Sequence, residues 1–380
     1  MKKVQNVEKE KSDKRIRSLY EKFAEKQDAK ISELLSVDSH TNYLYNSLYD
    51  HYLHHYFDVQ KPWLVYWIAN SLHVLSEADS LEQQQKKQLS NYILYFQDQE
   101  QGGFSGGLGY GPNLISTYAA ILSLIAIGDE DSWSRINRKK MEDFILSCRS
   151  PVIKGAYMAH ELGEIDMRCT YAAVLIAKLL NLNTQAIFDN VAEFVLTCQT
   201  YEGGIGPVPH VEAHGGYTFC GLAAMALLGK IDMLDVQKLT YWLVNKQMDE
   251  QGGFCGRTNK LVDSCYSFWQ ASCFNILSDH LLSKTNKETG LLYNVEMMQK
   301  YILVCCQGAK GGLKDKPTKN VDLYHTMYAL CGLSLSTQDA NKDNKLFNWD
   351  VRLEKPDPVA NVNVVCLENF RSYFAELNHP

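Results

Sequence analysis

Two cations and an Asp-x-Cys pair lie within the fourteen residues from Gly256 to Trp269. Arg257 and Lys260 precede Asp263 by six and three residues. Paired cations suit a polyphosphate, and a carboxylate beside a thiolate suits a borderline-soft metal such as zinc. This pattern indicates chemistry between an activated nucleophile and a diphosphate leaving group. The alternative is purely structural, with Asp263 capping a helix and Cys265 acting as a small buried hydrophobe.

A third ligand is needed if Asp263 and Cys265 bind a catalytic zinc, because such sites have three protein ligands and one open position. His325 follows the next glycine loop, at a similar place in its own repeat. We therefore expect His325 to complete the ligand set. The alternative is an ordinary core or surface histidine.

His214 extends the predicted anion site to another loop. It precedes a Gly-Gly pair, and glycines allow a ligand to approach the backbone closely. With Arg257 and Lys260 on the next loop, we expect a cradle for an anion in which Tyr266 is a neutral donor. The alternative is a turn that serves only helix packing.

A Gly-Gly-apolar signature repeats along the chain with a period near fifty, which is typical of a stacked supersecondary unit. The copies are Gly102-Gly103-Phe104, the degenerate Gly155-Ala156-Tyr157, Gly203-Gly204-Ile205, Gly252-Gly253-Phe254 and Gly311-Gly312-Leu313. An amphipathic stretch precedes a copy and an Ala- and Leu-rich segment follows it, so each unit reads as a helix pair joined by a glycine loop.

Such helix pairs can form an open solenoid or close into a ring. A ring would gather the glycine loops around one central cavity. The candidate residues Arg168, His214, Arg257 and His325 all follow glycine loops closely, and a solenoid would leave them scattered. We therefore predict an all-α fold, an α/α toroid of about six helix pairs with a central cavity.

The rest of the chain is assigned around this ring. We expect residues 1–40 to form a charged N-terminal arm, residues 41–350 the toroid, and residues 351–380 a tail that packs on it. The polar stretch from Gln338 to Lys345 reads as a solvent loop. No linker that would split the chain is evident.

Composition excludes several classes of protein. The chain has 380 residues, enough for a large core, and its net charge of −6 argues against broad nucleic-acid binding. The eleven cysteines are irregularly spaced and odd in number, which indicates free thiols in a reduced, cytoplasmic protein. No apolar run of about twenty residues exists, so no membrane span is expected.

Trp63 and Trp67 lie four residues apart, on one face of an expected helix. A stripe of this kind ordinarily belongs to a core. The alternative is the aromatic wall of a cavity that holds an apolar ligand.

Taken together, these motifs resemble the β subunit of protein prenyltransferases, most closely that of protein farnesyltransferase. The resemblance covers roughly residues 50 to 335. Its strongest stretches are Cys198–Gly221, Gly252–Ala271 and Asp315–Tyr328. The family's fold is an α/α toroid, in agreement with the repeat argument.

Matching motifs imply roles for individual residues. Asp263, Cys265 and His325 resemble the family's zinc ligands, while Lys260, Tyr266 and Asp315 resemble residues used in catalysis. The positions implied to bind the diphosphate or the prenyl chain are Arg168, His214, Gly216, Tyr217, Cys220, Arg257, Lys260, Tyr266 and Trp269. Those implied to line the peptide pocket or to set the prenyl chain length are Trp63, Trp67, Tyr324 and Tyr328.

The resemblance also implies a reaction. Farnesyl diphosphate would alkylate the cysteine of a C-terminal CaaX motif in proteins such as small GTPases, with one zinc ion per β subunit. Asp315 matches a position linked to magnesium, so magnesium is expected as well. The family works as a heterodimer with an α subunit, which implies that this chain needs that partner.

The main alternative within the family is the β subunit of geranylgeranyltransferase type I, which uses a 20-carbon donor. A large residue at the Trp63 position is implied to favour 15 carbons. A terpene cyclase would need an Asp-x-Asp-Asp acid or a paired-aspartate motif, and neither is present. A non-enzymatic prenyl carrier would not require the Asp-x-Cys pair with a distant histidine.

Overall fold

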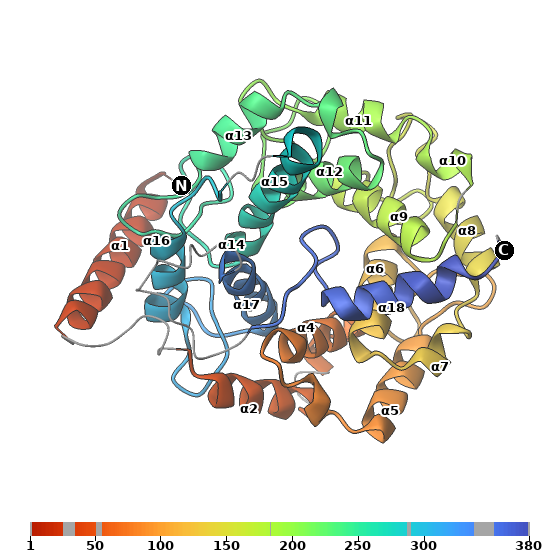
Figure 1. Ribbon diagram of the computed structural model, residues 1–380, viewed down its shortest axis with the longest axis horizontal. Coiled ribbons are helices and arrows are strands. Elements are labelled where there is room, and N and C mark those ends of the chain that lie inside the picture. Colours follow the sequence, from red (N-terminus) through yellow and green to blue (C-terminus); the bar gives the residue numbers. More distant parts are fainter. Residues whose placement is uncertain are drawn as a thin grey trace.

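Buried helices form the inner wall of a closed ring in the computed structural model (Figure 1). The model describes residues 2–25, 35–50, 55–182, 184–286, 290–337 and 353–378. The inner helices are α4 (Lys61–Val74), α6 (Leu114–Ile127), α9 (Met167–Leu179), α12 (Gly215–Leu227), α14 (Tyr266–Trp269) with α15 (Ala271–Thr285), and α17 (Leu323–Thr337). Each contacts the next in this order, and α17 contacts α4. That last contact closes the ring.

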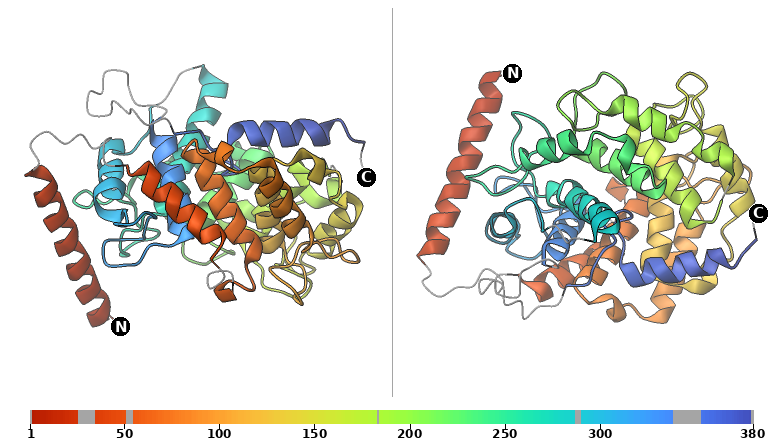
Figure 2. Two further views of the ribbon diagram at one scale, coloured as in Figure 1. Left: turned by 90° about the horizontal axis from the view of Figure 1, so that it is seen from below. Right: turned by 45° about the horizontal axis from the view of Figure 1, so that its top comes forward.

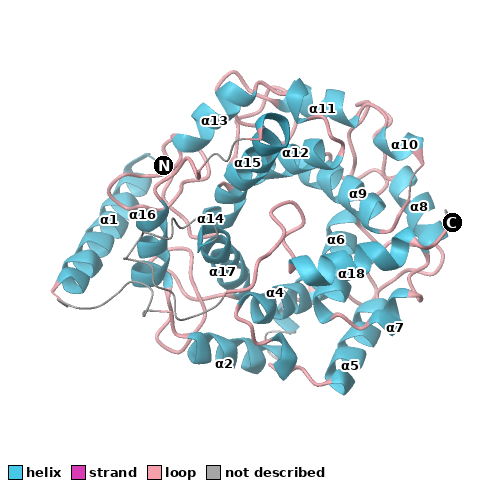
Figure 3. Ribbon diagram, in the orientation of Figure 1, coloured by secondary structure: helices cyan, strands magenta, loops and turns pink. Residues whose placement is uncertain are grey.

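Outer helices surround this wall, as can be seen in Figure 3, where all helices are cyan. They are α2 (Val37–Leu48), α5 (Gln83–Leu94), α8 (Arg138–Ser147), α11 (Val191–Cys198), α13 (Val236–Val244) and α16 (Val295–Lys300). In α5, for example, Ile93 and Leu94 are buried, while the Gln- and Lys-rich positions point outward. The amphipathic stretches therefore form the outside, and the Ala- and Leu-rich ones, apolar nearly all round, form the inside.

Short segments connect or extend these helices. They are η2 (Ala78–Ser80), α7 (Glu130–Trp133), α10 (Gln185–Phe188), η3 (Ile231–Met233) and the π-helical η4 (Tyr301–Cys306).

The glycine loops determine how each pair packs on the next. Gly252 has φ +77°, and a Cβ there would lie 2.3 Å from the carbonyl oxygen of Met297 on α16. Gly311 has φ +90°, and its Cβ would lie 1.9 Å from the carbonyl oxygen of Ser39 on α2. Only glycine permits these backbone contacts. Because the last loop packs on the first outer helix, the predicted toroid, rather than a solenoid, is confirmed.

The N-terminal helix α1 (Lys2–Ala24) lies outside the ring (Figure 2). It docks on the fourth glycine loop, where Arg17 pairs with Glu250 at 2.9 Å and the Tyr20 hydroxyl donates to the carbonyl of Gln251 at 2.7 Å. Ile16 is buried by this contact. The expected charged arm is thus a docked helix over its described part.

The C-terminal segment packs on one end of the ring, and α18 contacts the inner helices α6 and α9. The carbonyl of Val359 accepts a hydrogen bond from the Tyr171 hydroxyl, and that of Asn361 accepts one from the Tyr66 hydroxyl, both at 2.6 Å. Figure 1 shows this loop over the centre of the ring, followed by α18 (Val364–Ala375). The segment therefore fills one end of the toroid and leaves the other end for a cavity mouth.

Two further expectations concern a solvent loop and membrane-spanning helices. The predicted solvent loop from Gln338 to Lys345 lies outside the described residues. Within the described ranges, no helix combines the length and the apolar character that crossing a bilayer requires.

Candidate active site

A polar residue caps the start of the inner helix nine positions after the apolar residue of each glycine loop. These residues are Asn113, Asp166, His214, Asp263 and Asp322. The side chain of each accepts a hydrogen bond from a backbone N–H at the start of its helix. The repeat thus brings five polar side chains to equivalent places around one end of the ring.

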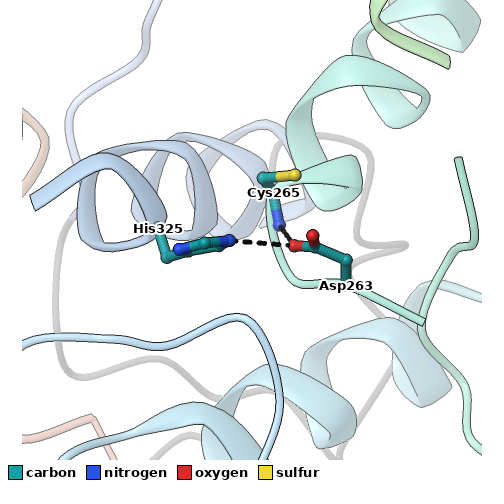
Figure 4. Close-up of side chains that lie close together, drawn as sticks. All are labelled: Asp263, Cys265 and His325. Carbon is teal, nitrogen blue, oxygen red and sulfur yellow. Dashed lines mark hydrogen bonds and ion pairs between the residues drawn. The ribbon is translucent and has the colours of Figure 1, made fainter. Parts of the chain in front are cut away.

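Three potential metal ligands meet where the fourth and fifth repeats adjoin. The ligand atoms of Asp263, Cys265 and His325 all lie within 4.8 Å of one another. His325 Nε2 lies 3.2 Å from Asp263 Oδ1, which also accepts from the backbone N–H of Cys265 at 2.9 Å (Figure 4). Two ligands come from one loop and the third from the first turn of α17, as the sequence predicts.

Asp322 orients the imidazole of His325. Its Oδ2 lies 2.6 Å from Nδ1, and its Oδ1 accepts the backbone N–H of His325 at 2.8 Å. Burial alone would lower the pKa of His325, but its bonds to Asp263 and Asp322 outweigh burial and raise that pKa to about 10. A carboxylate on the far nitrogen of a ligating histidine is a recurrent partner in metal sites.

Cys265 is only 3% exposed. Burial and the neighbouring Asp263 carboxylate raise the pKa of its thiol well above the ordinary value. Cys265 and His325 therefore both hold protons on the atoms that a cation would need. Cation binding at these residues must release protons.

The inner helix of the fourth repeat is interrupted at Gln270, between α14 and α15. In the other four repeats a threonine hydroxyl accepts the N–H of the loop's apolar residue, at 2.8 to 3.2 Å. Ser267 occupies this position in the fourth repeat and instead donates to the carbonyl of Ser264 at 2.5 Å. The first turn, α14, ends at Trp269, and the side chain of the next residue, Gln270, donates to the carbonyl of Cys255 at 2.8 Å.

A cavity of about 810 Å³ opens beside this site. It is lined by Gln60, Trp63, Trp67, Ile115, Tyr118, Arg168, Tyr171, Ala172, Pro207, Val211, Glu212, His214, Gly216, Tyr217, Cys220, Arg257, Tyr266, Trp269, Tyr324 and Tyr328. Aromatic rings form most of its deeper wall. A cavity of this size with an apolar wall and a few polar groups is typical of a ligand site.

Both tryptophans of the predicted pocket line this cavity. The ring of Trp63 lies 5.6 Å from those of Trp67 and Tyr118, between centroids. Trp67 in turn contacts Tyr324, whose hydroxyl accepts from Trp269 Nε1 at 2.9 Å. The tryptophan stripe is therefore a cavity wall, with Trp67 largely buried and Trp63 only partly so.

Tyr328 packs on a different part of the wall. Its ring lies 4.3 Å from that of Trp269 and 4.7 Å from that of Tyr324. The ring contacts of Trp63 are with Tyr66, Trp67 and Tyr118. Trp63 and Tyr328 thus line one cavity and are linked through the rings of Trp67 and Tyr324.

Polar groups converge at the cavity mouth. His214 Nδ1 accepts the N–H of Gly216 at 3.1 Å, and its Nε2 lies 2.9 Å from the hydroxyl of Tyr266. Arg257 pairs with Glu212 at 3.1 Å. Burial and nearby Arg257 lower the pKa of His214. This group joins the third and fourth repeats and offers several donors to an anion.

Three other predicted residues lie around this mouth. Lys260 is exposed on the same turn as Arg257, beyond the residues that line the cavity. Arg168 pairs with Asp166 and lies 5.9 Å from the ring centre of Tyr217. Cys220, also in the wall, is buried.

Asp315 lies near Asp263 and is not among the residues that line the cavity. Its carbonyl accepts from Ser264 N and from the Tyr301 hydroxyl, both at 3.0 Å. Its carboxylate pairs with Lys316, which is itself buried. Burial and the Asp263 charge raise the pKa of Asp315 to about 6. A salt-bridged lysine at this point was not expected from the sequence.

Sequence reasoning missed several residues of the site. Asp322 carried a usable signal, because a carboxylate three residues before a ligating histidine faces it across the first helical turn. Tyr118 and Tyr171 lie in the Ala- and Leu-rich segments predicted as repeat helices, and their common register could have placed them on one wall. Glu212 gave no signal, since its partner Arg257 is on another loop.

Comparisons with known proteins agree with this architecture. Residues 35–362 match the family model described as the prenyltransferase alpha-alpha toroid domain. The chain is 42% identical to the protein farnesyltransferase subunit beta of Schizosaccharomyces pombe, covering 74% of this chain and 73% of that protein. It is 36% identical to the subunit of the same name from Pisum sativum, over 78% and 80%.

A solved structure extends the comparison to three dimensions. The protein geranylgeranyltransferase-I of Candida albicans, complexed with GGPP, superposes with a TM-score of 0.76 at 22% identity. The match covers 90% of this chain and 100% of that one. At this identity the similarity supports the fold alone.

Proposed function

This chain belongs to the protein farnesyltransferase β-subunit family, and on that premise we propose that it transfers a farnesyl group from farnesyl diphosphate to proteins. The acceptor would be the cysteine thiol of a C-terminal CaaX motif. One observation carries the proposal. The Asp263, Cys265 and His325 cluster directly adjoins Tyr266 and Tyr324, which line one aromatic cavity together with His214 and Arg257.

The cluster fits zinc by the chemistry of its donors. A carboxylate, a thiol and an imidazole within 4.8 Å of one another match the three-ligand set of a catalytic zinc site. The His325–Asp322 pair supplies the usual outer partner. When bound there, zinc would lower the pKa of a substrate thiol so that a thiolate exists at neutral pH.

The chain's own residues would act on the diphosphate. In the reaction a bond forms between the substrate sulfur and C1 of the prenyl chain, the C1–oxygen bond breaks, and diphosphate leaves. His214, Tyr266 and Arg257 would stabilise the charge on the departing oxygens as preplaced donors. Lys260, exposed beside them, would add its ammonium when the substrate is present.

The cavity wall would bind the prenyl chain and the end of the peptide. Tyr217, Trp269 and Cys220 are among the residues that line it, and Trp63, Trp67 and Tyr324 form one continuous aromatic contact. We assign Trp63 to the side that limits chain length, because a large indole leaves less room for a fourth isoprene unit. On this basis a 15-carbon donor is favoured over the 20-carbon donor of geranylgeranyltransferase type I.

Magnesium is a separate proposal. Asp315 is one carboxylate, and it already pairs with Lys316. Magnesium is commonly held by one or two carboxylates together with substrate phosphates, so the diphosphate would have to supply most of the ligands. Asp315 would contribute only if its bond to Lys316 opened.

The family's naming as a β subunit supports a partner chain. We propose that this chain acts as a heterodimer with a helical-repeat α subunit, on proteins such as small GTPases, in the cytoplasm.

A donor competition assay tests the proposal. The chain would be co-expressed with candidate α subunits, and the purified complex offered farnesyl and geranylgeranyl diphosphates with CaaX peptides. We expect about one zinc per complex and a preference for farnesyl diphosphate in kcat/KM. A parallel magnesium titration would report whether Asp315 takes part. Equal use of both donors would overturn the farnesyl assignment, and activity without bound zinc would overturn the metal assignment.

A further inference from the structure

Lys246 is a buried cation next to the anion-binding turn. It follows α13 and is only 6% exposed. Its Nζ lies 4.8 Å from the ring centre of Trp242 and donates to the hydroxyl of Thr258 at 3.0 Å. Within the described part of the chain, no carboxylate pairs with this ammonium. A buried charge that lacks a counter-ion is costly, so its position calls for a physical reason.

Thr258 lies between the two cations of the turn. Arg257 precedes it directly, Lys260 follows two residues later, and the N–H of Lys260 donates to the carbonyl of Arg257 at 3.3 Å. Asn259 adopts φ +62°, in the left-handed region. A turn this short moves as a unit, so a displacement of Thr258 would move both cations.

The base of the turn is also held by Lys246. Its carbonyl accepts the N–H of Cys255 at 2.9 Å, and the carbonyl of Cys255 accepts from the side chain of Gln270. The backbone of Lys246 therefore fixes where the turn begins, and its ammonium fixes the tip. Lys238, on α13 itself, differs from Lys246, since it is exposed and pairs with Asp235.

We propose that Lys246 is a positioning residue for diphosphate binding: its ammonium holds Thr258, and through it the turn that carries Arg257 and Lys260. The inference rests on the proposed function, because it assigns a support to the same anion site. The buried charge also adds positive potential near the two cations, which a dianionic or trianionic ligand would feel. Trp242 keeps the lysine stem in place through a cation–π contact.

A purely structural role predicts something different. If Lys246 only filled space beside Trp242, its replacement by methionine would keep the packing of the stem. Any loss would then affect charged and uncharged ligands alike. A positioning role predicts weaker binding of ligands that carry the diphosphate and unchanged binding of the prenyl chain alone.

The test is direct ligand binding to the complex of this chain with its α partner, measured by quenching of tryptophan fluorescence. The probes are farnesyl diphosphate and farnesol, which share the prenyl chain but not the charge. The variants are Lys246→Met, Thr258→Val, which removes the acceptor but keeps the shape, and Thr258→Ser, which restores the hydroxyl. Lys238→Met is the control for losing a lysine from the neighbouring helix α13.

We expect Lys246→Met and Thr258→Val each to weaken farnesyl diphosphate binding by roughly tenfold, as for a hydrogen bond to a charged group. Farnesol binding should stay within about twofold, and Thr258→Ser and Lys238→Met should behave as wild type. Turnover at saturating donor should fall further, because misplacement by about 1 Å can cost around 10²-fold in rate. Thermal unfolding of each variant checks that the fold is intact.

Two results would overturn the inference alone. One is unchanged farnesyl diphosphate binding in Thr258→Val while the wild type binds normally. The other is an equal loss for farnesol and farnesyl diphosphate in Lys246→Met. A wild-type complex that fails to bind farnesyl diphosphate would overturn the proposed function, and this inference with it.

Discussion

The first and fourth glycine repeats share one backbone plan but differ in what their cap residues contact. In the first repeat, Asn113 accepts the N–H of Ser116 at 2.8 Å and donates to its hydroxyl at 3.0 Å. In the fourth, Asp263 accepts the N–H of Cys265 but also contacts His325, which belongs to the next repeat. The cap residue of the first repeat therefore bonds only within its own repeat in these contacts, whereas the cap residue of the fourth also contacts the next repeat.

This difference shows how a repeat protein can acquire a site at one junction. The loop register brings a polar cap to the end of every inner helix, so the geometry is available around the whole ring. Chemistry appears where neighbouring caps carry groups that complement each other, as Asp263 and the Asp322–His325 pair do. Cys265, at the N-terminal end of α14, adds a thiol to this pair.

The largest expected effect separates the fourth repeat from the rest. Cys265→Ala should remove zinc and lower turnover by more than about 10³-fold, because the substrate thiol regains its ordinary pKa and its orientation is lost. Metal analysis and single-turnover kinetics would measure this. The matched control, Cys148→Ala, removes a buried thiol at the end of α8 and should leave zinc unchanged. Full zinc content in Cys265→Ala would contradict the proposed difference in zinc binding between the fourth repeat and the first.

Lys260→Ala tests whether the turn of the fourth repeat contributes to catalysis as well as to structure. Loss of one donor to a leaving group typically costs on the order of 10² to 10³ in rate. We expect kcat to fall while the KM for peptide stays nearly constant. Lys238→Ala, an exposed lysine on α13, is the control. If the two alanine variants had the same kinetics, Lys260 would be an ordinary surface lysine.

Asp322→Asn probes the contact that crosses the repeat junction. The asparagine amide can still accept the backbone N–H of His325. It removes the negative charge that faces Nδ1 of His325. Loss of such an outer partner typically weakens metal affinity by 10- to 100-fold. Activity should fall at limiting zinc and recover when zinc is added. Failure of added zinc to restore activity would assign the loss to folding and not to the metal.

Trp63→Thr tests whether the cavity wall limits the length of the prenyl chain. Removing the indole should open the space beside Tyr118 and shift donor preference toward geranylgeranyl diphosphate, by roughly tenfold in the ratio of kcat/KM values. Competition between the two donors measures this ratio directly. An unchanged ratio would mean that other residues limit the prenyl chain.

The smallest effect is expected in the first repeat. Asn113→Ala should lower the free energy of unfolding by about 0.5 to 2 kcal/mol, the usual value of an N-cap. Zinc content and kinetics per folded molecule should not change. Denaturant titration and metal analysis would measure both. A loss of zinc here would contradict the separation of structural and functional caps.

Much of the site could be predicted from local sequence. Asp263, Cys265 and the cations before them lie close together in the chain, so their proximity in space follows from short-range geometry. His325 was found because it occupies a similar place in its own repeat. Asp322 could have been found by the same reasoning. Lys246 could not, since its partner Thr258 is reached only after the chain has turned through the glycine loop.

The sequence by itself determined the repeat, the helical content and the residue types at the loop positions, because periodic apolar patterns and glycines act over short distances. Tertiary structure decided the rest. It closed the ring through Gly311 and α2, filled one end with the Val359–Asn361 segment, and paired Asp315 with Lys316. These contacts join residues distant in the chain or depend on how side chains turn when buried, and no local pattern specifies which partners a closed ring brings together.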